Sequence, residues 1–418
     1  MLLLATCGHV LYACKLSVAH DPRNLTVLQV LPSLVTGGVE RGTLEITQAI
    51  VQAGGTALIA SAGGRLVTAI ERAGGRHITL PLTSKNPLVI WRNAGVLATI
   101  IRAERVAIVH ARSRAPAWSA RLACRRTGAH FVTTWHGTYN ENLPFKRRYN
   151  SVMAKGERVI AASRFIRDLI IARHRTAPDR IRVIPRGIDP AIFNPDVVLG
   201  DRVTRLARSW RLPESVPPIV LLPGRLTSWK GQAVLIQALA RMVRRDVCCV
   251  LVGSDQGRQR YVRRLINQAE ALGVADRVRL VGECDDMPAA LMMADIVVHA
   301  STRPEAFGRV VIEAQAMARP VIAADLGGPV ETVEHGVTGW RVPPGDAAIL
   351  AEAIEAVLAL PREARVDVGA RARMAVLDGY TVAAMQASTL AVYQEVLRGP
   401  TALPAAAQEA DTDEANAQ

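Results

Sequence analysis

The stretch IVLLPGRLTSWKGQAVLIQAL, residues 219–239, joins a short apolar run to a helix-like segment through a loop bounded by Gly224 and Gly231. A continuous apolar run of this length is typical of a strand buried on both faces, as in a parallel sheet covered by helices. Arg225 and Lys230 follow the end of that strand. An arginine fork and a lysine point charge suit a diphosphate at this place, although a surface pair without a ligand remains the alternative.

The same alternation of apolar runs and helix-like segments continues along the chain from Leu25. Strands are expected at 26–31, 57–61, 77–80, 106–110, 131–134, 158–162 and 181–184, and then at 219–223, 247–253, 278–281, 296–300 and 320–324. Since 418 residues exceed one typical domain, we predict an α/β protein with two doubly wound domains. Residues 190–216 are rich in Pro and Asp and weak in periodicity, which predicts a hinge.

The predicted domains cover residues 25–200 and 201–377, and ligands of such sheets bind beyond the carboxyl ends of the strands. Residues 1–24 precede the first expected strand, and we expect a poorly ordered extension there. Their apolar part has no basic residues before it, unlike a signal peptide. Residues 399–418 form an acidic, small-residue tail that we expect to be disordered. The six cysteines show no Cys-x-x-Cys spacing, which favours a reduced, cytoplasmic compartment.

Basic residues are concentrated in the first half of the chain. Residues 1–200 carry 27 Lys and Arg against 11 Asp and Glu, whereas residues 201–418 carry 24 against 26. Such a surface attracts anionic membranes or phosphate-rich polymers, and a solvated surface without a partner is the alternative. The residues that we assign to a membrane or acceptor patch are Arg112, Arg114, Lys146, Arg147 and Arg148.

Two glutamates follow the expected strand at 296–300. Pro304 and Gly308 interrupt any helix there, so Glu305 is expected in a loop and Glu313 in the second turn of a helix that begins near Gly308 or Arg309. Carboxylates seldom lie buried without donors, and sugar hydroxyls are such donors. We therefore expect one carboxylate to accept from a hexose and the other from a ribose. An exposed helix face is the alternative for Glu313.

The backbone between these glutamates is a second candidate for donor binding. The N–H groups at the start of a helix have no partner within the helix and bind anions well. We expect the N–H groups of Phe307, Gly308, Arg309 and Val310 to face phosphates.

Two weaker motifs follow strands of the first half. Gly37 and Gly38 precede a helix-like segment and permit close approach of an anion to its N-terminus, but an ordinary strand-to-helix turn accounts for them equally well. His136 in VTTWHGTY can bond a sugar hydroxyl or share a developing charge, and a structural histidine is equally compatible.

No metal or other cofactor is expected. No group of His, Cys, Asp and Glu has metal-ligand spacing, and the one Asp-x-Asp, at Asp411 and Asp413, lies in the acidic tail. Stabilisation of a departing diphosphate is then left to Arg225 and Lys230.

The chain carries, in this order, a Gly-Gly loop and the motifs His-Gly, Arg-x4-Lys-Gly, Glu-x-Phe-Gly and Glu-x7-Glu. In this it resembles the retaining nucleotide-sugar glycosyltransferases of group 1, or family 4. The resemblance covers residues 25–398. It implies a GT-B fold, in which two Rossmann-like domains face each other across a cleft and a C-terminal helix, residues 378–398, crosses back to the first domain.

The resemblance also implies roles for the residues at the motif positions. Arg225 and Lys230 would hold the diphosphate, Glu305 the donor sugar and Glu313 the ribose. His136 would contact the donor hexose near the reacting centre, and the Gly-Gly loop would lie near the phosphates and the acceptor. The chain departs from the family at two places: Ala306 stands where the family often has Pro, and Arg186 where it often has Asn.

The function implied is transfer of a sugar, with retention, from a nucleoside diphosphate sugar to an acceptor hydroxyl. From the basic first domain we expect a lipid-linked or envelope polysaccharide acceptor, such as a lipopolysaccharide core, at the cytoplasmic face of the inner membrane. A nucleotide-sugar 2-epimerase of the same fold is one alternative. A non-enzymatic nucleic-acid-binding protein is another, but it does not account for Glu305 and Glu313, and aromatic residues are sparse.

Overall fold

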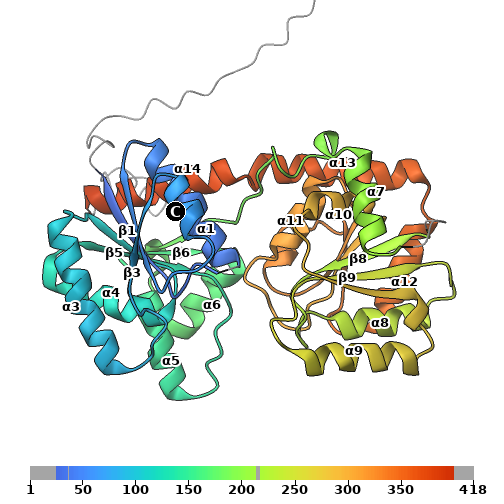
Figure 1. The fold of residues 1–418 in the computed structure, drawn as a ribbon, viewed down its shortest axis with the longest axis horizontal. Coiled ribbons are helices and arrows are strands. Elements are labelled where there is room, and N and C mark those ends of the chain that lie inside the picture. Colours follow the sequence, from blue (N-terminus) through green and yellow to red (C-terminus); the bar gives the residue numbers. More distant parts are fainter. Residues whose placement is uncertain (1–24, 36, 213–216, 400–418) are drawn as a thin grey trace, which may run out of the picture.

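A computed structural model describes residues 25–35, 37–212 and 217–399. The expectations for residues 1–24, for Asp411 and Asp413, and for the tail from residue 400 onward lie outside the described residues. The chain forms two α/β domains side by side (Figure 1). Among the described residues, no helix is both long enough and apolar enough to cross a bilayer.

The first domain contains a seven-stranded, all-parallel sheet in the order β3-β2-β1-β4-β5-β6-β7. Its strands are β1 (Thr26–Val30), β2 (Thr56–Ser61), β3 (Arg76–Thr79), β4 (Ile108–Ala111), β5 (His130–Trp135), β6 (Arg158–Ala161) and β7 (Ile181–Val183). Its helices are α1 (Gly38–Gln52), α2 (Val67–Arg72), α3 (Pro87–Ala103), α4 (Arg114–Thr127), α5 (Pro144–Asn150) and α6 (Arg164–His174).

The second domain contains a six-stranded, all-parallel sheet in the order β10-β9-β8-β11-β12-β13. Its strands are β8 (Ile219–Pro223), β9 (Cys248–Val252), β10 (Val278–Gly282), β11 (Ile296–His299), β12 (Val321–Ala324) and β13 (Trp340–Val342). Its helices are α7 (Gly200–Ser209), α8 (Gln232–Arg241), α9 (Gln259–Ala271), α10 (Met287–Met293), α11 (Arg309–Ala316), α12 (Ala347–Ala359) and α13 (Arg362–Gly379), and α14 (Val382–Arg398) follows. Every strand expected from the sequence is present, and β13 is an additional one.

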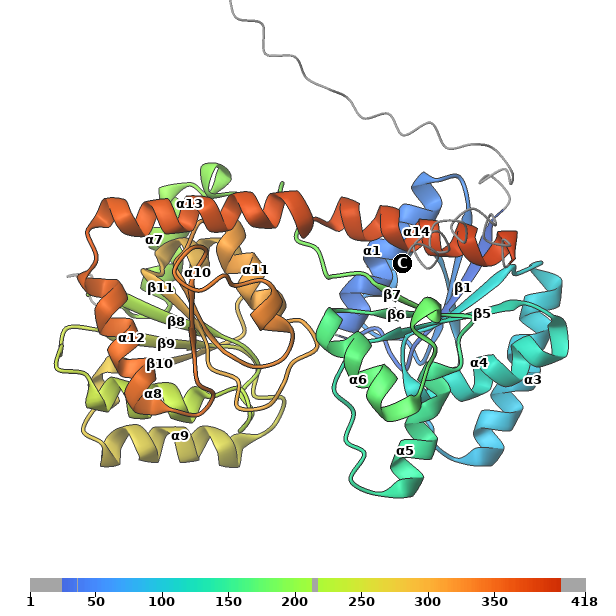
Figure 2. The same cartoon turned by 180° about the vertical axis from the view of Figure 1, so that it is seen from behind.

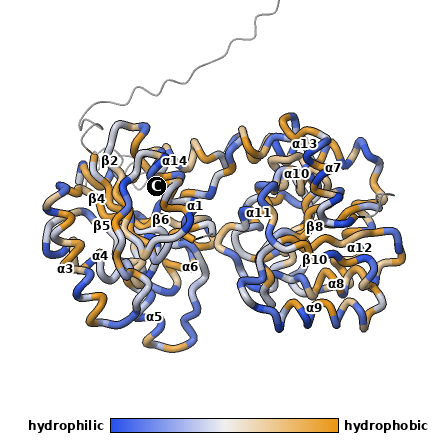
Figure 3. Tube along the Cα trace, in the orientation of Figure 1, coloured by the Kyte–Doolittle hydropathy of each residue, from blue (hydrophilic) through white to orange (hydrophobic). Residues whose placement is uncertain are grey.

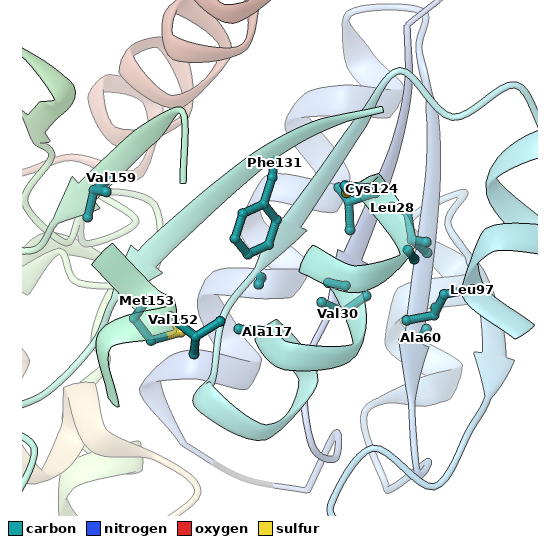
Figure 4. Close-up of a cluster of buried hydrophobic side chains, with 14 of the residues drawn as sticks. Leu28, Val30, Ala60, Leu97, Ala117, Cys124, Phe131, Val152, Met153 and Val159 are labelled. Carbon is teal, nitrogen blue, oxygen red and sulfur yellow. The ribbon is translucent and has the colours of Figure 1, made fainter. Parts of the chain in front are cut away.

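Apolar strands covered by helices account for both cores. Every residue of β8 and β9 is buried, as the unbroken apolar runs predicted. The strands are mostly hydrophobic, whereas several outer helices alternate hydrophobic and hydrophilic residues (Figure 3). In the first domain, Phe131 packs with Leu28, Val30 and Met153 in a single cluster beneath the sheet (Figure 4).

The chain passes between the domains at two points that lie against each other. Ile188 N–H donates to the carbonyl oxygen of Tyr380 at 2.9 Å, and Val382 N–H donates to that of Ile188 at 2.8 Å. A Cβ at Gly187 would lie 2.2 Å from the carbonyl carbon of Thr381, so only glycine permits this approach. After the second crossing, α14 packs against α1 of the first domain (Figure 2). This arrangement confirms the expected return of the C-terminal helix.

The order of the strands fixes where a ligand can bind. In each sheet the direction of winding reverses next to the first strand, between β1 and β4 and between β8 and β11. Loops separate at such a switch point and leave a crevice at the carboxyl ends of the strands. The Gly37 loop follows β1, Arg225 follows β8, and Glu305 follows β11. The fold therefore brings the sequence motifs to one place.

Candidate active site

A cleft of about 660 Å³ lies between the domains at these switch points. Gly37, Glu40 and Arg65 of the first domain line it together with Arg225 and Glu313 of the second. The predicted residues that line the cleft are Gly37, Gly224, Arg225, Lys230, Glu305, Val310 and Glu313, whereas Gly38, His136, Phe307, Gly308 and Arg309 do not line it.

Lys230 and Glu305 form an ion pair at the floor of the cleft. Lys230 Nζ donates to Glu305 Oε1 at 2.7 Å and to Oε2 at 2.8 Å. Gly231 makes this possible, because a Cβ there would lie 1.9 Å from the carbonyl oxygen of Ala300 and would push the loop away from β11. The lysine and the glutamate expected to bind different parts of a donor thus touch each other.

Two further donors hold the Glu305 carboxylate, and the sequence alone did not indicate either. His299 Nε2 lies 2.7 Å from Glu305 Oε1, and the Ser301 hydroxyl also donates to Oε1. Burial by itself would raise the pKa of Glu305, but the charges and hydrogen bonds of His299 and Lys230 hold it well below its usual value. Glu305 is therefore an ionised, rigidly held acceptor. The sequence feature that could have indicated His299 is its position at the carboxyl end of an apolar strand.

Arg225 differs from Lys230, since no side chain of the described residues bonds its guanidinium. Its backbone carbonyl accepts from Gln232 at 3.0 Å, which fixes the loop. Among the described residues, no carboxylate lies within ion-pair distance of its guanidinium, which is exposed and lines the cleft. Arg225 is therefore available to an anionic ligand, whereas Lys230 is shared with Glu305.

The N-terminus of α11 forms one wall of the cleft. Gly308 caps the helix with a positive φ of 83°, and a Cβ there would lie 2.6 Å from Pro329 Cγ, so glycine is required. Val310, in the first turn, lines the cleft, and the first N–H groups of a helix are free to meet an anion. The Phe307 side chain is in the core, with its ring centroid 5.8 Å from that of Tyr380. Only its backbone can serve a ligand.

Glu313 lies in the second turn of α11, as expected, and takes part in a network that spans the domains. Its Oε1 lies 3.5 Å from Arg309 Nε and 3.9 Å from Arg41 Nη1. Arg309 Nη2 reaches Glu45 Oε1 on α1 at 3.2 Å. The Arg309 side chain therefore lies against the first domain, whereas the prediction for this residue concerned its backbone N–H. The sequence did not indicate a role for Glu45 or Arg41, because their contacts depend on partners in the other domain.

His136 lies at the domain boundary beside Arg186, one of the two residues that depart from the family pattern. Arg186 Nη2 is 2.6 Å from His136 Nδ1. Burial, followed by the charges of Arg186 and Arg112, lowers the pKa of His136 well below its usual value, so the ring is neutral. A guanidinium can only donate, so Nδ1 accepts and the ring proton is on Nε2. That Nε2 is buried and has no partner among the described residues.

The basic patch is smaller than predicted. Arg112 is only 1 % exposed, and its Nε donates to Gln29 Oε1 at 2.7 Å, so its assignment to the surface is wrong. The reason is that Arg112 directly follows the buried strand β4, where its side chain turns beneath α1. Arg114 is half-buried, with its guanidinium 4.3 Å from the centroid of the Tyr139 ring. Lys146, Arg147 and Arg148 remain at the surface, on α5.

Within the part of the chain that the structure describes, no three His, Cys, Asp or Glu side chains are grouped as metal ligands would be.

Both domains match known protein families. Residues 36–192 match Glycosyltransferase Family 4, and residues 207–375 match Glycosyl transferases group 1. A crystal structure of a glycosyltransferase from Rickettsia africae is 38 % identical to this chain, with a TM-score of 0.84 and coverage of 90 % of this chain and 100 % of that one. This chain belongs to the group 1 glycosyltransferases. Its two facing Rossmann-like domains are the GT-B fold.

The chain is also similar to a structure with a bound nucleotide and to a named enzyme. Anabaena HepE, whose crystal structure is a complex with UDP and glucose, is 25 % identical, with a TM-score of 0.77 and coverage of 89 % of this chain and 100 % of that one. The D-inositol 3-phosphate glycosyltransferase of Xylanimonas cellulosilytica is 36 % identical over 225 residues, or 53 % of either chain. This group 1 glycosyltransferase thus spans about half the length of the curated relatives it matches.

Proposed function

We propose that the protein transfers a sugar from a nucleoside diphosphate sugar to an acceptor hydroxyl, with retention at the anomeric carbon and without a metal ion. The observation that carries this proposal is the convergence on one cleft of a free guanidinium, a helix N-terminus and two carboxylates. Arg225 and the N–H groups at the start of α11 meet the diphosphate. Glu305 accepts from donor-sugar hydroxyls and Glu313 from ribose hydroxyls.

The proposed reaction takes place on one face of the donor sugar. The bond from the anomeric carbon to the diphosphate oxygen breaks, and the acceptor oxygen bonds to the same carbon. The proton of the acceptor hydroxyl passes to an oxygen of the leaving diphosphate. Arg225 stabilises the charge that develops there, because a positioned cation in a closed cleft acts more strongly than in water. Lys230 contributes less to the diphosphate, since Glu305 shares its charge.

His136 serves the donor hexose in this scheme. His136 does not line the cleft, but its neutral ring carries a buried Nε2–H without a partner among the described residues, and we assign this hydrogen to a hydroxyl of the donor hexose. A neutral donor of this kind orients the sugar without adding a charge near the anomeric carbon.

The acceptor that we propose is a lipid-linked or envelope polysaccharide, such as a lipopolysaccharide core, at the cytoplasmic face of the membrane. The support lies on α5, where Phe145 is 66 % exposed beside Lys146, Arg147 and Arg148. Apolar and basic side chains on one short helix suit an anionic bilayer surface. Liposome co-sedimentation tests this with Phe145→Ser/Lys146→Gln. Equal binding of wild type and variant to phosphatidylglycerol vesicles would remove α5 from the proposal, and no binding of the wild type at low salt would remove the membrane.

A thermal-shift screen against UDP, GDP, ADP and their common sugars tests the donor. A ligand present at 100 times its Kd adds about 2.7 kcal/mol of stability. We expect one nucleotide to raise the melting temperature, and Arg225→Ala and Glu313→Ala to abolish that rise. Arg241→Ala, which removes an exposed arginine at the end of α8, is the matched control and should keep it. If no nucleotide shifts the folded protein, the proposed donor site is wrong.

Product analysis then separates transfer from epimerisation. The donor found in the screen is incubated with and without candidate acceptors, including inositol phosphates and lipopolysaccharide fragments. We expect a new glycoside only when an acceptor is present. Interconversion of the nucleotide sugar without an acceptor would instead indicate the 2-epimerase reaction.

A further inference from the structure

A second cavity, of about 580 Å³, lies in the first domain between α5 and the C-terminal end of α6. No residue that lines it also lines the cleft between the domains. Four arginines line it: Arg147 and Arg148 on α5, Arg173 near the end of α6, and Arg175 directly after it. Both helices lie on the lower part of the first domain (Figures 1 and 2).

The back wall of this α5–α6 cavity is rigid. Glu141 is nearly buried and accepts from His174 Nε2 at 3.0 Å. Arg173 Nη1 lies 3.9 Å from Glu141 Oε2 and donates to the carbonyl oxygen of Tyr139 at 3.0 Å. Arg147 donates to the carbonyl oxygen of Arg173. Two of the arginines are therefore already occupied by the protein itself, and Glu141 is the one carboxylate of the lining.

Arg148 and Arg175 are not occupied in this way. Among the described residues, neither guanidinium has a carboxylate within ion-pair distance, and both are exposed at the rim. Arg175 has a left-handed φ of 50°, a conformation that costs an arginine about 1 kcal/mol or more. The cavity thus has a positive rim over a wall with one acid, Glu141. Its Oε1 accepts from His174 and Asn150, whereas its buried Oε2 has no hydrogen-bond partner among the described residues and lies 3.9 Å from Arg173 Nη1.

We propose that the α5–α6 cavity binds a phosphate group of the acceptor, through Arg148 and Arg175. This inference rests on the proposed function, which supplies the acceptor. Guanidinium groups bond phosphate oxygens in pairs and stay charged at all relevant pH values, so two of them at one rim select such a dianion.

The position of the cavity limits the size of the acceptor. The N-terminal end of α6 meets the donor loop, where Ser163 contacts Ala306, and the cavity lies at the other end of the helix. Eleven residues of helix span about 16 Å at 1.5 Å per residue. The phosphate bound in the cavity and the hydroxyl that attacks the donor are therefore several sugar units apart. The acceptor class is an extended phosphorylated glycan or glycolipid, and a single sugar phosphate is too short.

Inorganic phosphate is the probe for the test, compared with sodium chloride at equal ionic strength. The donor cleft also attracts phosphate, so the measurement is made in Arg225→Ala. In that background, phosphate should still raise the melting temperature. Adding Arg148→Gln/Arg175→Gln should weaken the apparent affinity at least tenfold. Arg125→Gln/Arg126→Gln, which removes two exposed arginines at the end of α4, is the charge-matched control and should change nothing. Equal phosphate binding by both double variants would overturn the proposal.

A vesicle-binding experiment identifies the source of the phosphate. Binding to phosphatidylcholine vesicles with and without phosphatidic acid is measured for the same variants, alongside Phe145→Ser/Lys146→Gln, whose residues do not line the cavity. Loss of phosphatidic acid binding only in Arg148→Gln/Arg175→Gln assigns the phosphate to a lipid headgroup. Vesicle binding that survives this change, together with lost inorganic phosphate binding, assigns it to the glycan. The nucleotide screen is independent: a failed screen with phosphate binding intact would contradict the proposed transfer reaction and leave the cavity as a phosphate site.

Discussion

Ser163 of the first domain donates its hydroxyl hydrogen to the carbonyl oxygen of Ala306 in the second domain, at 2.7 Å. Thr138 makes the corresponding bond to the carbonyl oxygen of Pro304 at 3.0 Å. These two carbonyls flank Glu305, whose carboxylate lines the donor cleft. The first domain therefore holds the backbone on both sides of the donor-site glutamate, and the placement of Glu305 depends on how the domains close.

Replacing Thr138 by Val removes one of these bonds at nearly constant volume. Loss of the bond, with the Pro304 carbonyl left without its partner, costs about 1–2 kcal/mol, so we expect kcat to fall roughly five- to thirtyfold. Nucleotide affinity should stay within about twofold, because Arg225, which has no carboxylate partner among the described residues, belongs to the second domain. Steady-state kinetics and nucleotide titration measure the two effects separately.

Thr99→Val is the control, since within the described part of the chain the Thr99 hydroxyl bonds only the carbonyl of Gly95 in its own helix. If Thr138→Val and Thr99→Val have the same kcat, the contact with the donor loop does not position Glu305.

Lys230 and Arg225 should differ when each is replaced by Ala. Lys230→Ala leaves the nearly buried Glu305 carboxylate without the partner that bonds both of its oxygens, which costs about 3 kcal/mol of folding free energy. Arg225→Ala removes an unpaired, exposed side chain and should leave stability unchanged while kcat falls about 10²–10³-fold. Denaturant unfolding and initial rates measure both.

The double variant Lys230→Ala/Glu305→Gln separates a lost ion pair from a general defect. An uncharged glutamine amide at position 305 does not need a cationic partner. The double variant should therefore regain more than half of the stability lost in Lys230→Ala. A double variant as unstable as Lys230→Ala would mean that the Lys230 side chain stabilises the loop by packing alone.

The strands were predictable from the sequence because short apolar runs that alternate with helix-like segments suit few structures besides a parallel sheet. The last strand of the second sheet shows the limit, since β13 was missed. Its three residues lie between Gly339 and Pro343, and it pairs along one edge only, with β12. A strand this short has no period of its own, and its place in the sheet comes from the pairing of Trp340 with Ile322. Tertiary contact, rather than local pattern, determines it.

The site was predictable where a motif follows a strand directly, and less so elsewhere. Arg225, Lys230 and Glu305 lie at strand ends, and parallel strands end at one edge of the sheet. Glu45 and Arg309, by contrast, meet only because α1 and α11 face each other across the domain boundary. Nor does the sequence separate the buried Arg112 from the exposed arginines near it, because exposure depends on what covers the strand end.

The contact between Arg186 and His136 predicts a measurable change in titration. Arg186→Gln removes a positive charge that lowers the pKa of His136, so that pKa should rise, although burial and Arg112 still hold it below the ordinary value near 6.5. Histidine NMR titration, with His136→Gln for assignment, measures the shift. Arg65→Gln, in the cleft but without a contact to His136, is the control. A titration of His136 unaffected by Arg186→Gln would remove Arg186 as its positioning residue.

His110 predicts the pH dependence of stability. It is completely buried, with Nδ1 2.6 Å from the Tyr393 hydroxyl of α14 and Nε2 2.6 Å from Thr134 Oγ1. Burial, and then the charges of Arg112 and Arg186, lower its pKa well below the ordinary value of a histidine. Above about pH 6.5 the folded and unfolded states both hold a neutral ring, so the pKa shift has no effect on stability there.

Below that pH the unfolded state binds a proton that the folded state excludes, so stability falls by up to about 1.4 kcal/mol per pH unit until the folded pKa is reached. His136 acts in the same direction. The unfolding free energy of His110→Gln should therefore decrease less steeply between about pH 7 and pH 5. The slope should be smaller by up to about 1.4 kcal/mol per pH unit, which is the contribution of one proton. His335→Gln, at an exposed position, keeps both buried histidines and should retain the wild-type slope. Urea unfolding at several pH values measures this, and equal slopes in wild type and His110→Gln would show that His110 is already protonated in the folded protein.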